Sequence, residues 1–330
     1  MALRPVTVFA LGGTIAMTPG AEGRAVPAIS ADALAAAVLG LERIARVTAV
    51  DFRQLPGAHL TLDDILALAR AISAAAEAGA AGAVVTQGTD TIEETAFALD
   101  LLIGPDLPVV VTGAMRHAGM AGAEGPANLL AAVAVAAAED ARGLGTVVVM
   151  NDTIHAAVLV HKAHSTRPDA FASPTAGPIG FIAEGVPHIL LRPAARARVP
   201  MPGEGADRPV ALLASGLGDD GRLIGAVAAG GFAGAVIAAT GAGHLSEAAA
   251  DAAADLAQAM PVVLASRTGA GPVLAGTYGF AGSESDLAAR GLIRAGWLDP
   301  AKARVLLALA LRAGFDEAWL RTAFAAYGGG

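Results

Sequence analysis

The feature that most constrains the fold is a regular alternation of short apolar runs with longer, alanine-rich runs. The short runs have the length of buried strands and the long runs have the length of helices, a pattern that predicts β-α-β units and a parallel sheet. A hydrophobic fraction of 55% and a charged fraction of 16% agree with a large buried core. The predicted strands are Val6–Leu11, Val47–Phe52, Ala83–Thr86, Val109–Thr112 and Thr146–Met150. The predicted helices are Ala31–Leu39, Leu62–Ala78, Ile92–Leu102 and Ala127–Glu139.

The alternation is interrupted once, between residues 191 and 209, where prolines, arginines and glycines concentrate. This composition is typical of an extended linker. Beyond it the alternation resumes, with strands expected at Val210–Ala214, Ala235–Thr240 and Val262–Ser266 and helices at Leu223–Ala229, Glu247–Ala259, Ala301–Arg312 and Glu317–Ala326. We therefore predict two α/β domains. The larger, residues 1–190, has a mostly parallel, flavodoxin- or Rossmann-like sheet with flanking helices; the smaller is residues 210–330. The tail Gly328–Gly330 is expected to be disordered.

Composition also excludes several classes of protein. A net charge of −8 provides no basic field for nucleic acid or anionic lipid. There is no cysteine, so disulfides, thiolate zinc sites and a cysteine nucleophile are excluded. Seven histidines are present, but without an H-E-x-x-H motif or a carboxylate–histidine cluster, so we expect surface or core histidines and no metal site. No secretory signal or membrane span is evident, which predicts a soluble cytoplasmic protein without membrane or nucleic-acid partners.

Two segments place threonine hydroxyl groups at the ends of predicted strands. Gly12-Gly13-Thr14 follows the first strand, and its glycines allow close approach of the backbone to a ligand. A hydroxyl group beside exposed N–H groups is what a nucleophile attacking a carbonyl group requires. An ordinary strand-to-loop turn is the simpler interpretation of this segment taken alone.

The second segment, Gln87-Gly88-Thr89-Asp90-Thr91-Ile92-Glu93-Glu94, sets a hydroxyl group beside a carboxylate where a strand becomes a helix. Thr91 and Glu94 have the spacing of a capping box, and Thr61 is a plausible N-cap of the preceding helix. A hydroxyl group needs a basic partner to become a nucleophile, and Lys162 is a candidate. From its position alone, an exposed loop lysine is the simpler interpretation of Lys162.

These segments together resemble the bacterial-type L-asparaginase (asparaginase/glutaminase) family, and the similarity runs through nearly the whole chain in the same order. The segments that carry it are Gly12-Gly13-Thr14-Ile15-Ala16, Gln87–Ala96, Gly113-Ala114-Met115-Arg116, Gly125-Pro126-Ala127-Asn128-Leu129, Met150-Asn151-Asp152-Thr153 and Pro300-Ala301-Lys302-Ala303-Arg304. The resemblance implies a two-domain α/β hydrolase that cleaves the side-chain amide of asparagine, and in some members of glutamine, without metal or cofactor.

The resemblance also implies roles for individual residues. Thr14 is the nucleophile that forms an acyl-enzyme, while Thr89, Asp90 and Lys162 form the set that moves protons. Asp90 and Glu284 bind the α-ammonium group of the substrate. In the family this glutamate comes from a neighbouring subunit, which implies a homodimer or homotetramer with shared sites.

Three departures from the family pattern concern the substrate rather than the chemistry. The loop after Thr14 lacks the family's tyrosine, and Val26 or a neighbour takes its place. Gly57 and Ala58 stand where the family has substrate-binding serine and glutamine or serine side chains, which leaves backbone N–H groups to bind the α-carboxylate. His244 replaces an asparagine and adds sensitivity to pH near neutrality.

Two alternative functions therefore remain open. One is hydrolysis of another amide: glutamine, D-asparagine or an N-substituted asparagine. The other is a catalytically silent amino-acid-binding protein. A separate motif, Gly216-Leu217-Gly218-Asp219-Asp220-Gly221, matches the spacing of a dinucleotide-binding loop, but its aspartates would repel a pyrophosphate, so we predict a plain turn between a strand and a helix.

Overall fold

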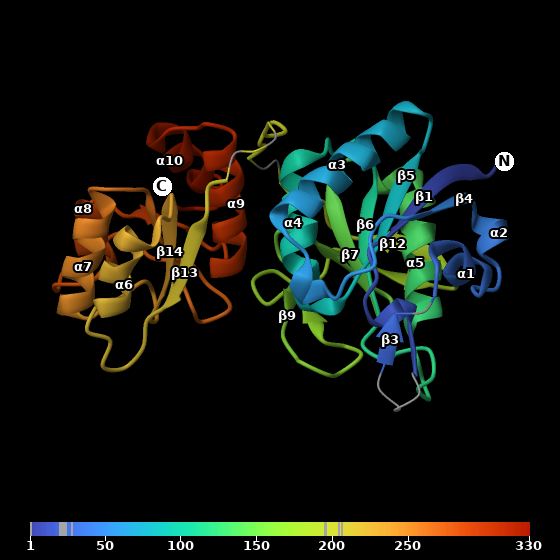
Figure 1. Cartoon of the computed structure of the whole chain (residues 1–330), viewed down its shortest axis with the longest axis horizontal. Helices are drawn as coiled ribbons and strands as arrows, with labels where there is room; N and C mark the ends of the chain where they lie inside the picture. The colour runs from blue at the N-terminus through green and yellow to red at the C-terminus, as the bar shows by residue number, and fades with distance from the viewer. Residues whose placement is uncertain (1, 20–24, 28, 195–196, 204, 206) are drawn as a thin grey trace. The chain divides into compact units, whose positions relative to one another are not determined.

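The computed structural model describes residues 2–19, 25–27, 29–194, 197–203, 205 and 207–330 (Figure 1). The chain forms two compact units, Met1–Ala195 and Arg196–Gly330, which we call the N-terminal and C-terminal units. Both are α/β, so the predicted fold class is confirmed. Parts of two predicted segments lie outside the described residues: 20–24 in the loop after Thr14, and 195, 196, 204 and 206 in the linker.

The N-terminal unit is built on an eight-stranded sheet in the order β12-β11-β8-β7-β6-β5-β1-β4. Its strands are β1 (Arg4–Ala10), β4 (Ala45–Asp51), β5 (Gly82–Thr86), β6 (Val109–Thr112), β7 (Thr146–Met150), β8 (Thr153–Ala156), β11 (Gly180–Ala183) and β12 (Val186–Ile189). The five strands from β4 to β7 run parallel, and β8, β11 and β12 extend the sheet with antiparallel pairing. Two small antiparallel ribbons complete the unit: β2 (Met17–Pro19) with β3 (Ala25–Pro27), and β9 (His161–Lys162) with β10 (Phe171–Ala172).

Helices cover both faces of this sheet, which explains why β5, β6 and β7 are continuous buried apolar runs (Figure 1). The helices α3 (Leu62–Glu77) and α4 (Ile92–Leu102) lie on one face, with α1 (Ala31–Ala36), α2 (Leu41–Ile44) and α5 (Gly125–Ala137) on the other. Helix α5 packs very closely, because a Cβ atom at Gly82 of β5 would lie 2.1 Å from the Ala136 carbonyl oxygen.

The C-terminal unit has a four-stranded parallel sheet in the order β13-β14-β15-β16. Its strands are β13 (Val210–Ala214), β14 (Gly234–Ala239), β15 (Val262–Ser266) and β16 (Ile293–Arg294), and its helices are α6 (Arg222–Val227), α7 (Glu247–Ala257), α8 (Glu284–Ala289), α9 (Pro300–Arg312) and α10 (Glu317–Ala325). Helices α6 and α7 pack together on one face and α9 covers the other (Figure 1). No helix in the described part of the chain is long and apolar enough to cross a membrane.

Two local predictions are corrected. The Thr91–Glu94 capping box does not form: a 3-10 turn, Thr89–Thr91, leads directly into α4, and the Thr91 hydroxyl group donates instead to the Gly57 carbonyl oxygen. Thr61 does cap α3, in a capping box with Asp64. The expected disorder of the glycine tail is also wrong, because the Gly330 N–H group donates to the Arg294 carbonyl oxygen at 2.9 Å.

Candidate active site

The strand order places the two threonine segments side by side. Strand β4 lies on one side of β1 and β5 lies on the other, so the direction of winding reverses between β1 and β5. Open α/β sheets bind ligands at the carboxyl ends of the strands that flank such a point. Strand β1 leads into Gly12-Gly13-Thr14, and β5 leads into Gln87–Asp90. A backbone hydrogen bond of 2.8 Å from the Leu11 N–H group to the Thr86 carbonyl oxygen joins the two strand ends.

Three loops meet here backbone to backbone, and glycine makes the contact possible. Gly13 has a φ of 83°, and a Cβ atom on it would lie 2.1 Å from the Gly88 nitrogen. A Cβ atom on Gly57, in the 3-10 turn η2 (Gly57–His59), would lie 2.9 Å from the Gly88 carbonyl oxygen. Position 57 therefore has no room for a side chain, and its glycine is required by packing. Ala58, by contrast, is exposed.

Side-chain hydrogen bonds hold the Gly57 turn against the β5 loop. The Thr91 hydroxyl group donates to the Gly57 carbonyl oxygen at 3.0 Å, and the buried Gln87 amide donates to the Thr91 oxygen at 3.3 Å. Gln87 also donates to the Gly88 carbonyl oxygen at 3.3 Å. The two loops are thus tied to each other as well as packed.

Lys162 lies against the β5 loop and contacts both predicted partners. Its Nζ donates to Thr89 Oγ1 at 2.9 Å and to Asp90 Oδ1 at 2.7 Å. The Lys162 side chain is 14% exposed, whereas that of Asp90 is 65% exposed. Thr14 is half-buried at the start of the adjacent 3-10 turn, Thr14–Ala16. The structure therefore brings Thr89, Asp90 and Lys162 into one hydrogen-bonded set next to the loop that carries Thr14.

A buried histidine contacts the segment that follows the ribbon carrying Lys162. Lys162 pairs with Phe171 in the β9–β10 ribbon, and Ser173 follows that ribbon directly. The Ser173 hydroxyl group lies 2.9 Å from Nδ1 of His155 in β8, and both residues are buried. Burial lowers the pKa of His155 from 6.5 to about 4. The imidazole is therefore neutral at physiological pH.

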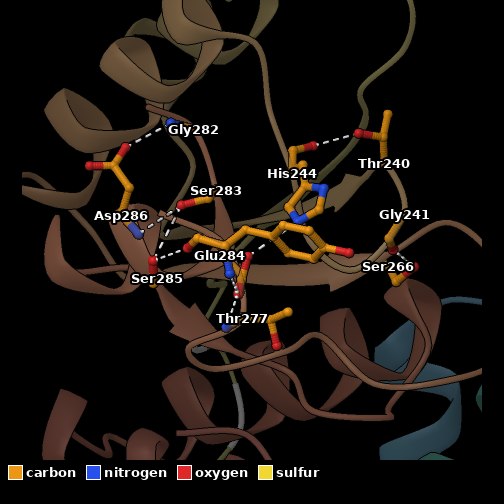
Figure 2. Close-up of polar contacts among 11 residues, drawn as sticks. Thr240, Gly241, His244, Ser266, Thr277, Gly282, Ser283, Glu284, Ser285 and Asp286 are labelled. Carbon is orange, nitrogen blue, oxygen red and sulfur yellow. Dashed lines mark hydrogen bonds and ion pairs between the residues drawn. The ribbon is translucent and has the colours of Figure 1, made fainter. Parts of the chain in front are cut away.

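The other two predicted residues, His244 and Glu284, meet in the C-terminal unit (Figure 2). Glu284 is fully buried at the first position of α8 and accepts bonds from Thr277 N at 2.8 Å and Tyr278 N at 2.9 Å. His244 Nε2 lies 3.2 Å from its second oxygen. Burial alone would raise the pKa of the Glu284 carboxyl group, but these hydrogen bonds hold that pKa below its usual value.

Two aromatic rings contact the His244 imidazole, and the sequence reasoning did not single them out. The ring centroids of Tyr278 and Phe280 lie 4.9 Å and 5.1 Å from that of His244, both in edge-on arrangements. Both aromatic side chains are exposed. The only signal in the sequence was a Tyr-Gly-Phe run in a chain with 4% aromatic residues.

The Gly216–Gly221 motif forms the turn between β13 and α6, as predicted. Gly218 and Gly221 have φ angles of 80° and 79°, and the Asp219 side chain accepts a bond from the Gly221 N–H group. Among the residues that the structure describes, no group of three or more histidine, cysteine, aspartate or glutamate side chains is suited to hold a metal ion.

Comparison with known proteins covers both units. The family described as "Asparaginase, N-terminal" matches residues 5–195, and the "Glutaminase/Asparaginase C-terminal domain" matches residues 209–324. The chain belongs to the asparaginase family. The predicted resemblance is therefore confirmed.

Individual relatives of this asparaginase-family protein match it along most of their length. A probable L-asparaginase of Deinococcus radiodurans is 39% identical over 325 residues, which cover 95% of this chain and 94% of that protein. An L-asparaginase of Bacillus licheniformis is 35% identical over 315 residues, covering 93% of this chain and 95% of that protein. The crystal structure of a probable cytoplasmic L-asparaginase from Campylobacter jejuni has a TM-score of 0.89 at 32% identity, with 98% of this chain and 100% of that chain covered.

Proposed function

We propose that this protein hydrolyses the side-chain amide of L-asparagine to L-aspartate and ammonia. The contact of Lys162 with both Thr89 and Asp90, beside the Thr14 loop, carries the proposal. Membership of the asparaginase family and the names of its relatives support it. A cytoplasmic location is part of the same proposal, and the related Campylobacter jejuni protein is described as a probable cytoplasmic L-asparaginase.

Thr14 is the proposed nucleophile. Its Oγ attacks the amide carbon as the hydroxyl proton passes to the set formed by Thr89, Lys162 and Asp90. The C–N bond then breaks, the leaving nitrogen takes a proton from the same set, and ammonia departs from a Thr14 ester. Water attacks this ester, its proton enters the set, and Thr14 regains its hydroxyl proton as aspartate leaves. Backbone N–H groups of the glycine-containing loops beside Thr14 are the proposed donors to the developing oxyanion.

Substitution of the nucleophile tests the reaction directly. Thr14→Ala protein is incubated with asparagine, and ammonia release is compared with that of the wild type. We expect loss of turnover without loss of folding, which a thermal denaturation curve checks. Turnover near the wild-type value in Thr14→Ala would remove Thr14 from the mechanism. Absence of ammonia release by the wild type would refute the proposed function.

We further propose that the active form is a homodimer or homotetramer in which Glu284 of one subunit serves the Thr14 of another. The Thr14→Ala and Glu284→Ala variants are denatured, mixed and refolded together. Random mixing makes about half of the dimers hybrids that contain one subunit of each variant. In a hybrid, one of the two sites combines an intact Thr14 with an intact Glu284, so about a quarter of all sites regain activity. Recovery no greater than the sum of the two variants refolded separately would show that each subunit supplies both residues of its own site.

A preference for a different amide is the second candidate. The short, exposed Ala58 side chain favours it, because few side-chain atoms there can select the α-substituents of the substrate. Ranking L-asparagine, L-glutamine, D-asparagine and an N-substituted asparagine by kcat/KM decides between them, since only differences in transition-state binding set preference. A silent binding protein would instead be stabilised thermally by an amino acid while releasing no ammonia from any of these amides.

A further inference from the structure

Lys162 is held at both ends by one short segment of the chain. Its Nζ contacts Thr89 and Asp90, and its backbone N–H group donates to Glu93 Oε2 at 3.0 Å. Residues 89–91 form the 3-10 turn and Glu93 lies in the first turn of α4, which continues from it. A single rigid segment thus contacts the lysine at its tip and at its backbone.

The lysine needs such support because its own strand is short. Strand β9 contains two residues, His161 and Lys162, and it pairs with the two residues of β10 in a ribbon separate from the main sheet. Such a ribbon leaves much of the orientation of Lys162 to other contacts. Helix α4, by contrast, is buried along most of its length.

Glu93 supplies the contact that ties the ribbon to the helix. Its side chain is 12% exposed, and the oxygen that accepts from Lys162 N also lies 2.8 Å from His161 Nδ1. One carboxylate oxygen therefore binds both residues of β9. Bonds from N–H groups to a carboxylate are shorter and stronger than neutral ones, so they suit a positional restraint.

We propose that Glu93 is a positioning residue for catalysis: it fixes the backbone of Lys162 so that Nζ reaches Thr89 and Asp90 together. The inference rests on the proposed function. Glu93 acts through Lys162 and does not touch the substrate, so its removal lowers kcat and leaves KM nearly unchanged. A misplacement of about 1 Å at a catalytic group can cost about 100-fold in rate.

Three substitutions separate geometry from charge. Glu93→Ala removes the acceptor, Glu93→Asp keeps the charge but withdraws it by one methylene group, and Glu93→Gln keeps an acceptor oxygen at full reach without the charge. The matched controls are Glu42→Ala and Glu42→Gln, because Glu42 is a carboxylate of the same unit whose side chain is 72% exposed. For each protein, kcat and KM for asparagine are measured by ammonia release, with a thermal denaturation curve.

We expect Glu93→Ala to lower kcat by about 10-fold to 100-fold with KM within about threefold of the wild type. Glu93→Gln should retain a kcat at least several times that of Glu93→Ala, and Glu93→Asp should fall below Glu93→Gln. If Glu93→Ala does not fold, the order of the Asp and Gln variants carries the test. A wild-type kcat in Glu93→Ala, or a Gln variant no faster than the Asp variant, would overturn the role. A wild type that releases no ammonia would instead refute the proposed function, and this role with it.

Discussion

Acid should destabilise the N-terminal unit through the buried His155. Its pKa is about 4 in the folded protein against an ordinary value of 6.5. Because the folded pKa is the lower one, the unfolded chain binds more protons between these values, so stability is lost as the pH falls from 6.5 towards 4 and levels off below. At 1.36 kcal/mol per pKa unit the full loss is about 3 kcal/mol, of which about 2 kcal/mol has gone by pH 5.

A variant without the titrating ring isolates this effect. His155→Asn can keep a hydrogen bond to Ser173 but cannot take up a proton in this range. Urea unfolding is followed at pH 7, 6 and 5 by far-UV circular dichroism, because both tryptophans, Trp297 and Trp319, lie in the C-terminal unit. The wild type should lose about 2 kcal/mol more than the variant between pH 7 and pH 5. Equal losses in the two proteins would refute the reasoning, and Ser173→Ala, which keeps the buried ring, should behave like the wild type.

The remaining predictions concern the site itself. Lys162→Met should lower kcat for asparagine by about 100-fold to 10,000-fold, because the set that moves protons loses its base. A loss below about tenfold in the ammonia assay would show that Lys162 is not that base. Gly13→Ala should lower the thermal midpoint and the activity, because the added methyl group meets the Gly88 backbone, and an unchanged midpoint would contradict that close approach. We propose that Glu284 binds the substrate ammonium group, so Glu284→Gln should raise KM about 10-fold or more, and an unchanged KM would exclude that contact.

Where an element is a continuous buried run, the sequence was sufficient to locate it. Strands β6, β7, β13 and β15 and helix α4 begin and end at the predicted residues, and most other predicted elements differ by one or two residues at an end. Helix α1 ends at Ala36, three residues before the predicted end at Leu39. The antiparallel strands β8, β11 and β12 were not predicted. They are four residues each and include His155 and Pro187, so they lack the apolar run that marked the others.

The parts of the site that escaped prediction depend on contacts between distant residues. The Thr91 hydroxyl group had the local spacing of a helix cap, but the Gly57 carbonyl oxygen, reached only through the fold, takes its hydrogen bond instead. In the sequence, Glu93 is an ordinary acidic residue of a first helical turn. Only the fold shows that it accepts a hydrogen bond from the Lys162 N–H group of β9. Local patterns predict which groups a strand end presents, whereas the partners of those groups follow from the topology.

The environment of Glu284 restricts how any additional cation can approach it. An ionised carboxylate has about four acceptor positions, and Glu284 uses Oε1 for the Thr277 and Tyr278 N–H groups while Oε2 faces His244. A further cation would therefore approach Glu284 beside the imidazole, near the rings of Tyr278 and Phe280 that contact it. Aromatic faces attract an ammonium group, and a neutral His244 can donate to the carboxylate without repelling that cation, whereas a protonated one repels it. Under the proposal that Glu284 binds a substrate ammonium group, the side chain at position 244 thus bears directly on the affinity for that group.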